Sequence, residues 1–231
     1  MANGIFLVDL LMTDSEWLQC QNPRSMINFV LRKRDRKMRL AAVAGCRLFG
    51  DHLGDDRLWQ ALDVAERFAD GLAAYAELEA AWDNANIAFK ALSDDEQAAA
   101  GHEEELHDAI EAAWAARQTV SPEPEGAFFH LSMFSGYEFL IAHIVRDVFG
   151  PPTRVLLNPA WLTSQVTALA DSIYQERAFD ALPVLADALE DAGCNDAGIL
   201  EHCRGIDAAP ASMRIQHARG CWVLDLLLGR S

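Results

Sequence analysis

Helix start and stop signals recur along this sequence, and they constrain its fold more than any other feature. Thr13 and Glu16 form a capping-box pattern, in which each side chain accepts a backbone N–H at the start of a helix. Asn22-Pro23 joins an N-cap residue to the proline favoured at the first helical position. Between such signals apolar residues recur every three or four positions, and no segment alternates with a period of two. The sequence therefore predicts an all-α fold, a compact multi-helix stack of about nine or ten helices.

An alanine-rich region lies in the middle of the chain. Two helices are expected there, near 74–91 and 94–118, and Ser93 to Glu96 give the second one a capping box. Their composition predicts a central antiparallel helical hairpin. Residues 121–126, SPEPEG, form the clearest linker. We expect a single domain over 1–231, with a possible subdivision into 13–120 and 127–231.

Composition and apolar stretches indicate an intracellular protein. Hydrophobic residues make up 51% of the chain, too many for a disordered one. The apolar residues 5–12 follow no basic residue, which argues against a signal peptide. Residues 128–149 carry ionisable groups that favour a core helix over a membrane span. The five widely spaced cysteines do not resemble a disulfide framework, so a reducing, cytoplasmic location is expected.

The chain has a net charge of −16, and its charged residues are unevenly distributed along the sequence. Residues 24–47 hold eight basic groups and one acid. The candidate partner-binding residues of this basic segment are Arg32, Lys33, Arg36, Lys37 and Arg39. These cations could bind a phosphate-bearing or acidic partner, but pairing with the chain's own acidic helices or plain solvation is favoured. Nucleic acid is disfavoured because the chain is acidic and no aromatic residues are interleaved with these cations.

The cysteines and histidines near the C-terminus are the sharpest candidates for a site. Cys194, Cys203, His217 and Cys221 have residue types that bind Zn²⁺, with His202 beside Cys203. On a helix expected over 212–228, His217 and Cys221 would lie one turn apart. No Cys-x2-Cys pair is present, so small buried core cysteines remain the favoured alternative. Zn²⁺ is the one cofactor that the sequence suggests.

Enzymatic motifs are missing from the sequence. It has no phosphate-binding glycine-rich loop and no Gly-x-Ser-x-Gly elbow. An enzyme using a buried acid–base pair of Glu138 and His143 is one alternative. The favoured function is a non-enzymatic interaction, scaffold or regulatory protein whose partner is another protein. The oligomeric state is left open.

Short motifs give the chain a resemblance to a known family. They are EW at 16–17, RKMRL at 36–40, AERFADG at 65–71, PAWLT at 159–163, IYQERAFD at 173–180, LADALEDAGC at 185–194, HCR at 202–204 and HARGCW at 217–222. In these motifs the sequence resembles a large, uncharacterised paralogous family abundant in planctomycete bacteria. The resemblance covers 13–90 and 144–229 and implies no catalytic residue. It does place His202, Cys203, His217 and Cys221 inside family motifs, which raises the metal interpretation modestly but leaves core packing favoured.

Overall fold

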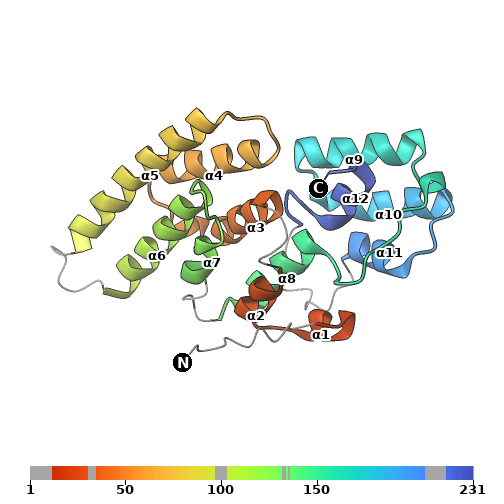
Figure 1. Cartoon of the computed structure of the whole chain (residues 1–231), viewed down its shortest axis with the longest axis horizontal. Coiled ribbons are helices and arrows are strands. Elements are labelled where there is room, and N and C mark those ends of the chain that lie inside the picture. The colour runs from red at the N-terminus through yellow and green to blue at the C-terminus, as the bar shows by residue number, and fades with distance from the viewer. Residues whose placement is uncertain are drawn as a thin grey trace, which may run out of the picture.

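The computed structural model describes residues 12–30, 35–96, 103–131, 134, 136–205 and 217–230, and every regular element within these ranges is a helix. The prediction of an all-α fold is therefore confirmed (Figure 1). The α-helices are α1 (Asp14–Gln19), α2 (Pro23–Val30), α3 (Asp35–Leu48), α4 (Asp56–Ala69), α5 (Tyr75–Glu96), α6 (Glu103–Thr119), α7 (Gly126–Leu131), α8 (Glu138–Phe149), α9 (Ser164–Glu176), α10 (Leu182–Asp191), α11 (Ala197–Arg204) and α12 (Trp222–Leu228). Three 3₁₀ turns are η1 (Gly50–His52), η2 (Pro159–Trp161) and η3 (Phe179–Ala181). Among the described helices, none is long and apolar enough to cross a membrane.

Several helices begin where the local sequence predicts. The backbone N–H of Glu16 donates to Thr13 Oγ1 at 3.2 Å, and the Thr13 N–H donates to Glu16 Oε2 at 2.9 Å, which completes the capping box of α1. The side chain of Asn22 accepts a hydrogen bond from the N–H of Ser25 ahead of α2. These starts are predictable because a cap needs only residues three or four positions apart.

The alanine-rich hairpin forms, but its predicted boundary is wrong. Helix α5 continues through the proposed capping box at 93–96, and α6 begins only at Glu103. Ser93 donates its hydroxyl to the carbonyl of Phe89 within α5 instead of capping a new helix. Helices α5 and α6 pack against each other, and several alanines on both helices are buried, which suits close packing. The buried alanines are Ala81, Ala85 and Ala88 on α5 and Ala112, Ala113, Ala115 and Ala116 on α6.

The buried apolar side chains of the described residues form two separate hydrophobic cores. Helices α1 to α8 enclose the first core and form the N-terminal half, whereas α9 to α12 enclose the second and form the C-terminal half (Figure 1). The chain passes from one to the other through residues 150–158, not at the proposed linker 121–126. That linker is held to the first core, because the buried Arg39 donates to the carbonyls of Thr119 and Ser121.

Buried charged groups join the two halves. Arg36 on α3 donates to Asp70, the C-cap of α4, at 2.9 Å. The same guanidinium reaches Asp225 on α12 at 2.7 Å and the hydroxyl of Tyr174 on α9 at 2.7 Å. Asp70 and Asp225 are only 1% and 2% exposed. We call this group of four residues the Arg36 network.

Removing Arg36 should destabilise the protein strongly. The substitution Arg36→Met leaves two buried carboxylates without their main cationic partner, a change that costs about 3–5 kcal/mol in comparable buried pairs. Urea denaturation would measure the loss in the free energy of unfolding. Arg57→Met is the matched control, because Arg57 pairs at the surface with Asp55, two residues away. Equal and small effects of the two substitutions would contradict the role given to Arg36.

Candidate metal centre

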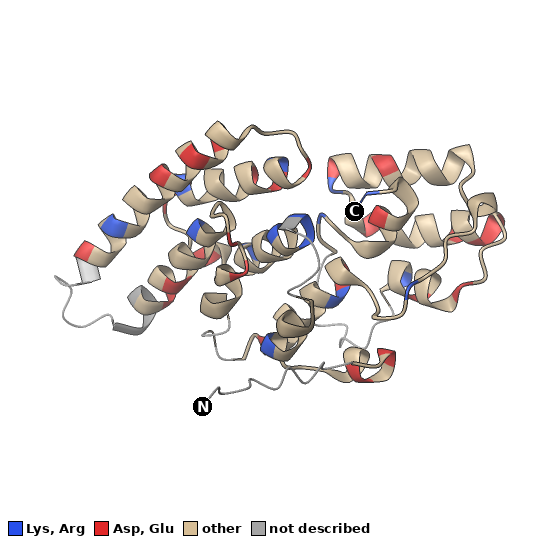
Figure 2. Ribbon diagram, in the orientation of Figure 1, with Lys and Arg blue, Asp and Glu red and all other residues tan. Residues whose placement is uncertain are grey.

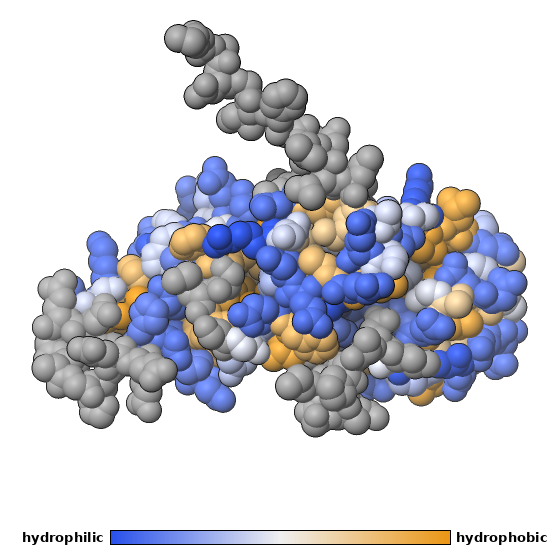
Figure 3. All heavy atoms as spheres, turned by 90° about the horizontal axis from the view of Figure 1, so that it is seen from below, coloured by the Kyte–Doolittle hydropathy of each residue, from blue (hydrophilic) through white to orange (hydrophobic). Residues whose placement is uncertain are grey.

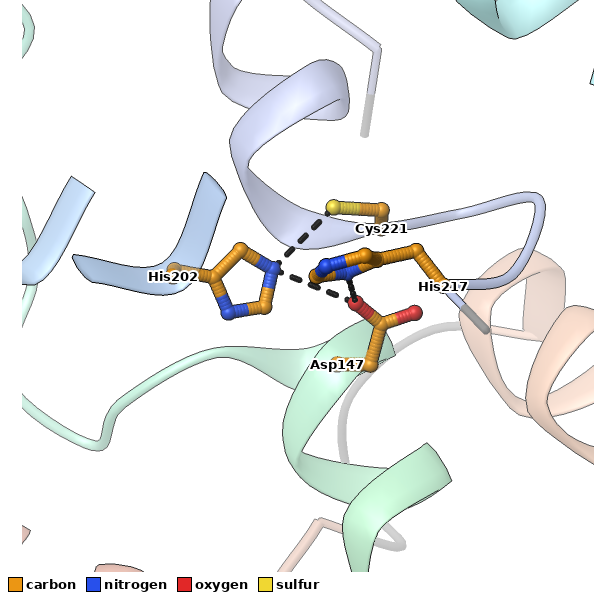
Figure 4. A group of neighbouring side chains, drawn as sticks. All are labelled: Asp147, His202, His217 and Cys221. Atoms are coloured by element: carbon orange, nitrogen blue, oxygen red, sulfur yellow. Dashed lines mark hydrogen bonds and ion pairs between the residues drawn. The ribbon is translucent and has the colours of Figure 1, made fainter. Parts of the chain in front are cut away.

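Four potential metal-ligand side chains meet where the two halves join (Figure 4). Asp147 comes from α8, His202 from α11, His217 from the segment before α12, and Cys221 is the N-cap of α12. One ligand atom from each residue lies within 4.8 Å of the other three. His202 Nε2 is 3.2 Å from Cys221 Sγ and 3.1 Å from Asp147 Oδ1. His217 Nδ1 is 2.6 Å from the same carboxylate oxygen.

A tight turn brings His217 beside Cys221. The expected helix over 212–228 is wrong at His217–Gly220, which are not helical, and residues 212–216 lie outside the described ranges. The N–H of Cys221 donates to the carbonyl of Ala218 at 3.0 Å, and Gly220 has φ of +93°. This φ strains any residue other than glycine, and a Cβ on Gly220 would also lie 2.8 Å from Leu40 Cδ1, so glycine is strongly favoured here. Residues 217–221 are called the ligand turn below.

Asp147 organises the ligand turn. Its side chain is 2% exposed, and its second oxygen accepts the backbone N–H of Ala218 at 2.8 Å. Burial alone would raise the pKa of Asp147, but the charges and hydrogen bonds of His217 and His202 hold that pKa well below its usual range. Burial alone would lower the pKa of His217, but Asp147 raises it to about 10. Without a metal, the pair is therefore ionised at neutral pH.

Cys221 differs from the other buried cysteines in its electrostatic environment. Burial raises the pKa of Cys203 to about 12 and also raises the pKa of Cys46 and Cys194. Burial and Asp147 would raise the pKa of Cys221 as well, but His202 and hydrogen bonds from both imidazoles lower it. The thiolate is the form that binds a metal, so these contacts favour the ligand state of Cys221.

The geometry fits a shared centre better than a proton relay. In a Cys-His-Asp relay, the histidine uses one ring nitrogen for the thiol and the other for the carboxylate. Cys221 and Asp147 both approach the same atom of His202, Nε2, so His202 does not have the arrangement of a relay. His217 contacts both Asp147 and Cys221, so both imidazoles face the same two side chains. Asp147, His202 and Cys221 are each at most 6% exposed, which leaves the thiol without access for a substrate. Convergence of four ligand atoms on one point is what a metal ion requires.

The donor set fits zinc. One thiolate, two imidazoles and one carboxylate are ligands for Zn²⁺ or Co²⁺, whereas Mg²⁺ and Ca²⁺ prefer oxygen alone. Tetrahedral zinc would separate its ligand atoms by about 3.3–3.8 Å. The separations of 2.6 to 4.8 Å lie around that range, so small side-chain shifts would suffice. Four protein ligands make a closed site of the structural kind.

The structure brings together two of the four predicted ligands. His217 and Cys221 belong to the convergent group, and Cys194 and Cys203 do not. Cys203 directly follows His202 on α11, and neighbouring helical residues point about 100° apart, so it packs into the second core. Cys194 precedes α11 and is buried in that core as well. Asp147, a further member of the convergent group, was not among the predicted ligands, although an acid within the apolar stretch 128–149 is a signal in the sequence.

The proposed acid–base pair of Glu138 and His143 is not a buried pair. Glu138 is exposed at the start of α8, where it accepts the N–H of Gly136 at 2.9 Å. His143 is buried, with 9% exposure, and lies further along the same helix. Residues five positions apart point to different sides of a helix. The interpretation as a buried pair was therefore wrong.

The basic segment is engaged within the molecule where the structure describes it. Arg36 belongs to the network above, and Lys37 donates to the carbonyl of Val148 and pairs with Asp225 at 3.3 Å. Arg39 is 4% exposed. Arg32 and Lys33 lie outside the described residues. Binding of a partner by this segment stays a prediction.

Comparison with protein-family models, curated proteins and solved structures finds no match for this chain. The resemblance to the planctomycete family therefore stays a prediction.

The metal-free protein should show a pH-dependent contribution from His217. Its pKa rises from 6.5 to about 10, so the stabilisation is complete below pH 6.5 and is lost as the pH rises toward 10. We expect His217→Gln to lower the free energy of unfolding more at about pH 6 than at about pH 10. Urea denaturation in the presence of a chelator would measure both values. An equal loss at the two pH values would contradict this assignment.

Proposed function

We propose that this protein is a zinc-stabilised helical module that binds another protein and has no catalytic role. The observation that carries the metal part is the convergence of Asp147, His202, His217 and Cys221 within 4.8 Å. The residues are buried or half-buried and come from α8, α11 and the ligand turn. Zn²⁺ at this point would join the N-terminal half to two separate segments of the C-terminal half.

A structural metal suits the way the two halves meet. Two separate hydrophobic cores lie on either side of the junction, and charged side chains such as Arg36 and Asp225 lie between them. Interfaces of this polar kind permit relative motion unless another constraint is present. A metal bound by ligands from both sides supplies such a constraint, and its binding free energy adds to the stability of the fold.

The interaction role is supported by how the chain uses its charges. Arg36, Lys37 and Arg39 are largely buried, so they neutralise internal groups in a chain of net charge −16 and leave the exposed surface more acidic. The face in Figure 3 is mainly hydrophilic, with separate hydrophobic patches. Such a surface favours a cationic protein partner over nucleic acid. A cytoplasmic location completes the proposal, because all five cysteines are free and a reducing compartment preserves a thiol ligand.

Metal analysis of the purified chain tests the proposal. We expect close to one zinc per chain by elemental analysis, and Co²⁺ in its place should give the visible absorption of tetrahedral cobalt with a thiolate ligand. Asp147→Ala, His202→Ala and Cys221→Ser should each weaken metal binding. Mutating residues that only hydrogen-bond to metal ligands costs roughly 10–100-fold in affinity, so the loss of a ligand should cost at least that much.

Cys203→Ser is the matched control. Cys203 is a buried cysteine next to a proposed ligand, but it lies outside the convergent group, so this variant should keep its metal. Metal well below one equivalent in the wild-type chain would overturn the zinc site. Loss of metal in Cys203→Ser with retention in Cys221→Ser would replace the ligand set.

A further inference from the structure

Two arginines pack against the same buried tyrosine at the junction of the halves. The guanidinium of Arg219, in the ligand turn, lies 5.1 Å from the ring centre of Tyr174. The guanidinium of Arg230, just after α12, lies 4.2 Å from the same centre. Tyr174 is fully buried, whereas the side chains of Arg219 and Arg230 are 10% and 28% exposed. The two arginines therefore cover the tyrosine and lie between it and solvent.

Neither arginine side chain donates a hydrogen bond within the described part of the chain. Arg219 Nε is buried and has no hydrogen-bond partner among the described residues. Its nearest acid, Asp70, is 3.5 Å away, and Arg230 lies 4.0 Å from the same carboxylate. Asp70 already accepts hydrogen bonds from Arg36 and from Tyr174 at 2.8 to 2.9 Å. Arginine donors form planar forks that are normally satisfied. Among the described residues, Arg219 and Arg230 have only long ion pairs, with Asp70 and Asp171, and no side-chain hydrogen bond.

The local charge balance is positive, in contrast to the protein as a whole. The cations at this place are Arg36, Lys37, Arg219 and Arg230, and the buried acids are Asp70 and Asp225. Asp171 lies 3.9 Å from Arg230 but is 57% exposed, so water screens its charge. Figure 2 shows Lys and Arg positions gathered between α3, α9 and the end of α12. An excess of cations in a partly buried place requires a counter-charge.

We propose that Arg219 and Arg230 bind the phosphoryl group of inorganic phosphate or of a small phosphate ester. The arginines offer two guanidinium forks, and a phosphoryl group offers enough oxygens to accept from both at once. Its double negative charge matches the local excess better than a single carboxylate does. Neither arginine is a proposed zinc ligand, although Arg219 lies in the ligand turn. Metal content and phosphate binding are measured separately, and Arg230 lies outside that turn, so failure of one proposal is distinguishable from failure of the other.

Calorimetric titration tests the proposal. Inorganic phosphate and glycerol phosphate are titrated into the full chain at low ionic strength, and acetate serves as the carboxylate probe. We expect both phosphates to bind and acetate to bind far more weakly; tighter binding of one phosphate identifies the source. The absence of phosphate binding at millimolar concentration, or equal binding of acetate, would overturn the proposal.

Substitutions then locate the bound phosphate. Arg230→Gln and Arg219→Gln should each weaken phosphate binding at least about tenfold, since each removes charge-assisted hydrogen bonds. Arg204→Gln is the control, because Arg204 also lies in the C-terminal half but is paired with Asp187 and Glu190. Circular dichroism checks that each variant is folded. The side chain of Arg230 is more exposed than that of Arg219, so Arg230→Gln still tests phosphate binding if Arg219→Gln unfolds. Unchanged affinity in Arg230→Gln would refute the site.

Discussion

Asp147 is a buried carboxylate on which the joining of the two halves depends. It comes from the N-terminal half, and its partners come from the C-terminal half: the imidazoles of His202 and His217 and the N–H of Ala218. A buried ionised acid is costly unless it is paired and hydrogen-bonded. The fold therefore satisfies Asp147 only when α11 and the ligand turn are both in place. The same contacts bring the four proposed zinc ligands together before any metal is considered.

The ligand turn connects the two proposed sites. His217 and Cys221 point to Asp147, while Arg219, between them in sequence, packs against Tyr174. Gly220 makes this possible, because its positive φ and its close approach to Leu40 fix the direction of the chain. A short segment with little regular structure thus carries more of the candidate chemistry than the long helices do. The helices contribute by holding its neighbours still.

Features that depend on neighbouring residues can be predicted from sequence more fully than contacts between residues far apart in the chain. The capping box of Thr13 and Glu16 and the all-α class were predictable, because both depend on residues a few positions apart. The capping pattern at Ser93 misled because α5 continues through it, supported by packing against α4 and α6. Residue type pointed to His217 and Cys221, two members of the convergent group. Asp147 and His202 could not be assigned, since their convergence depends on how α8 and α11 pack in three dimensions.

The order of the proposed ligands along the chain has a consequence for synthesis on the ribosome. Asp147 emerges with α8 when the N-terminal half is complete, well before His202, His217 and Cys221. Until His202 and His217 have been synthesised, the carboxylate of Asp147 has no cationic partner from the C-terminal half, so hydration is favoured over burial. The junction side of the first core should thus stay loosely packed in the nascent chain. Helix α12, which is made much later than α8, would then complete the packing of α8.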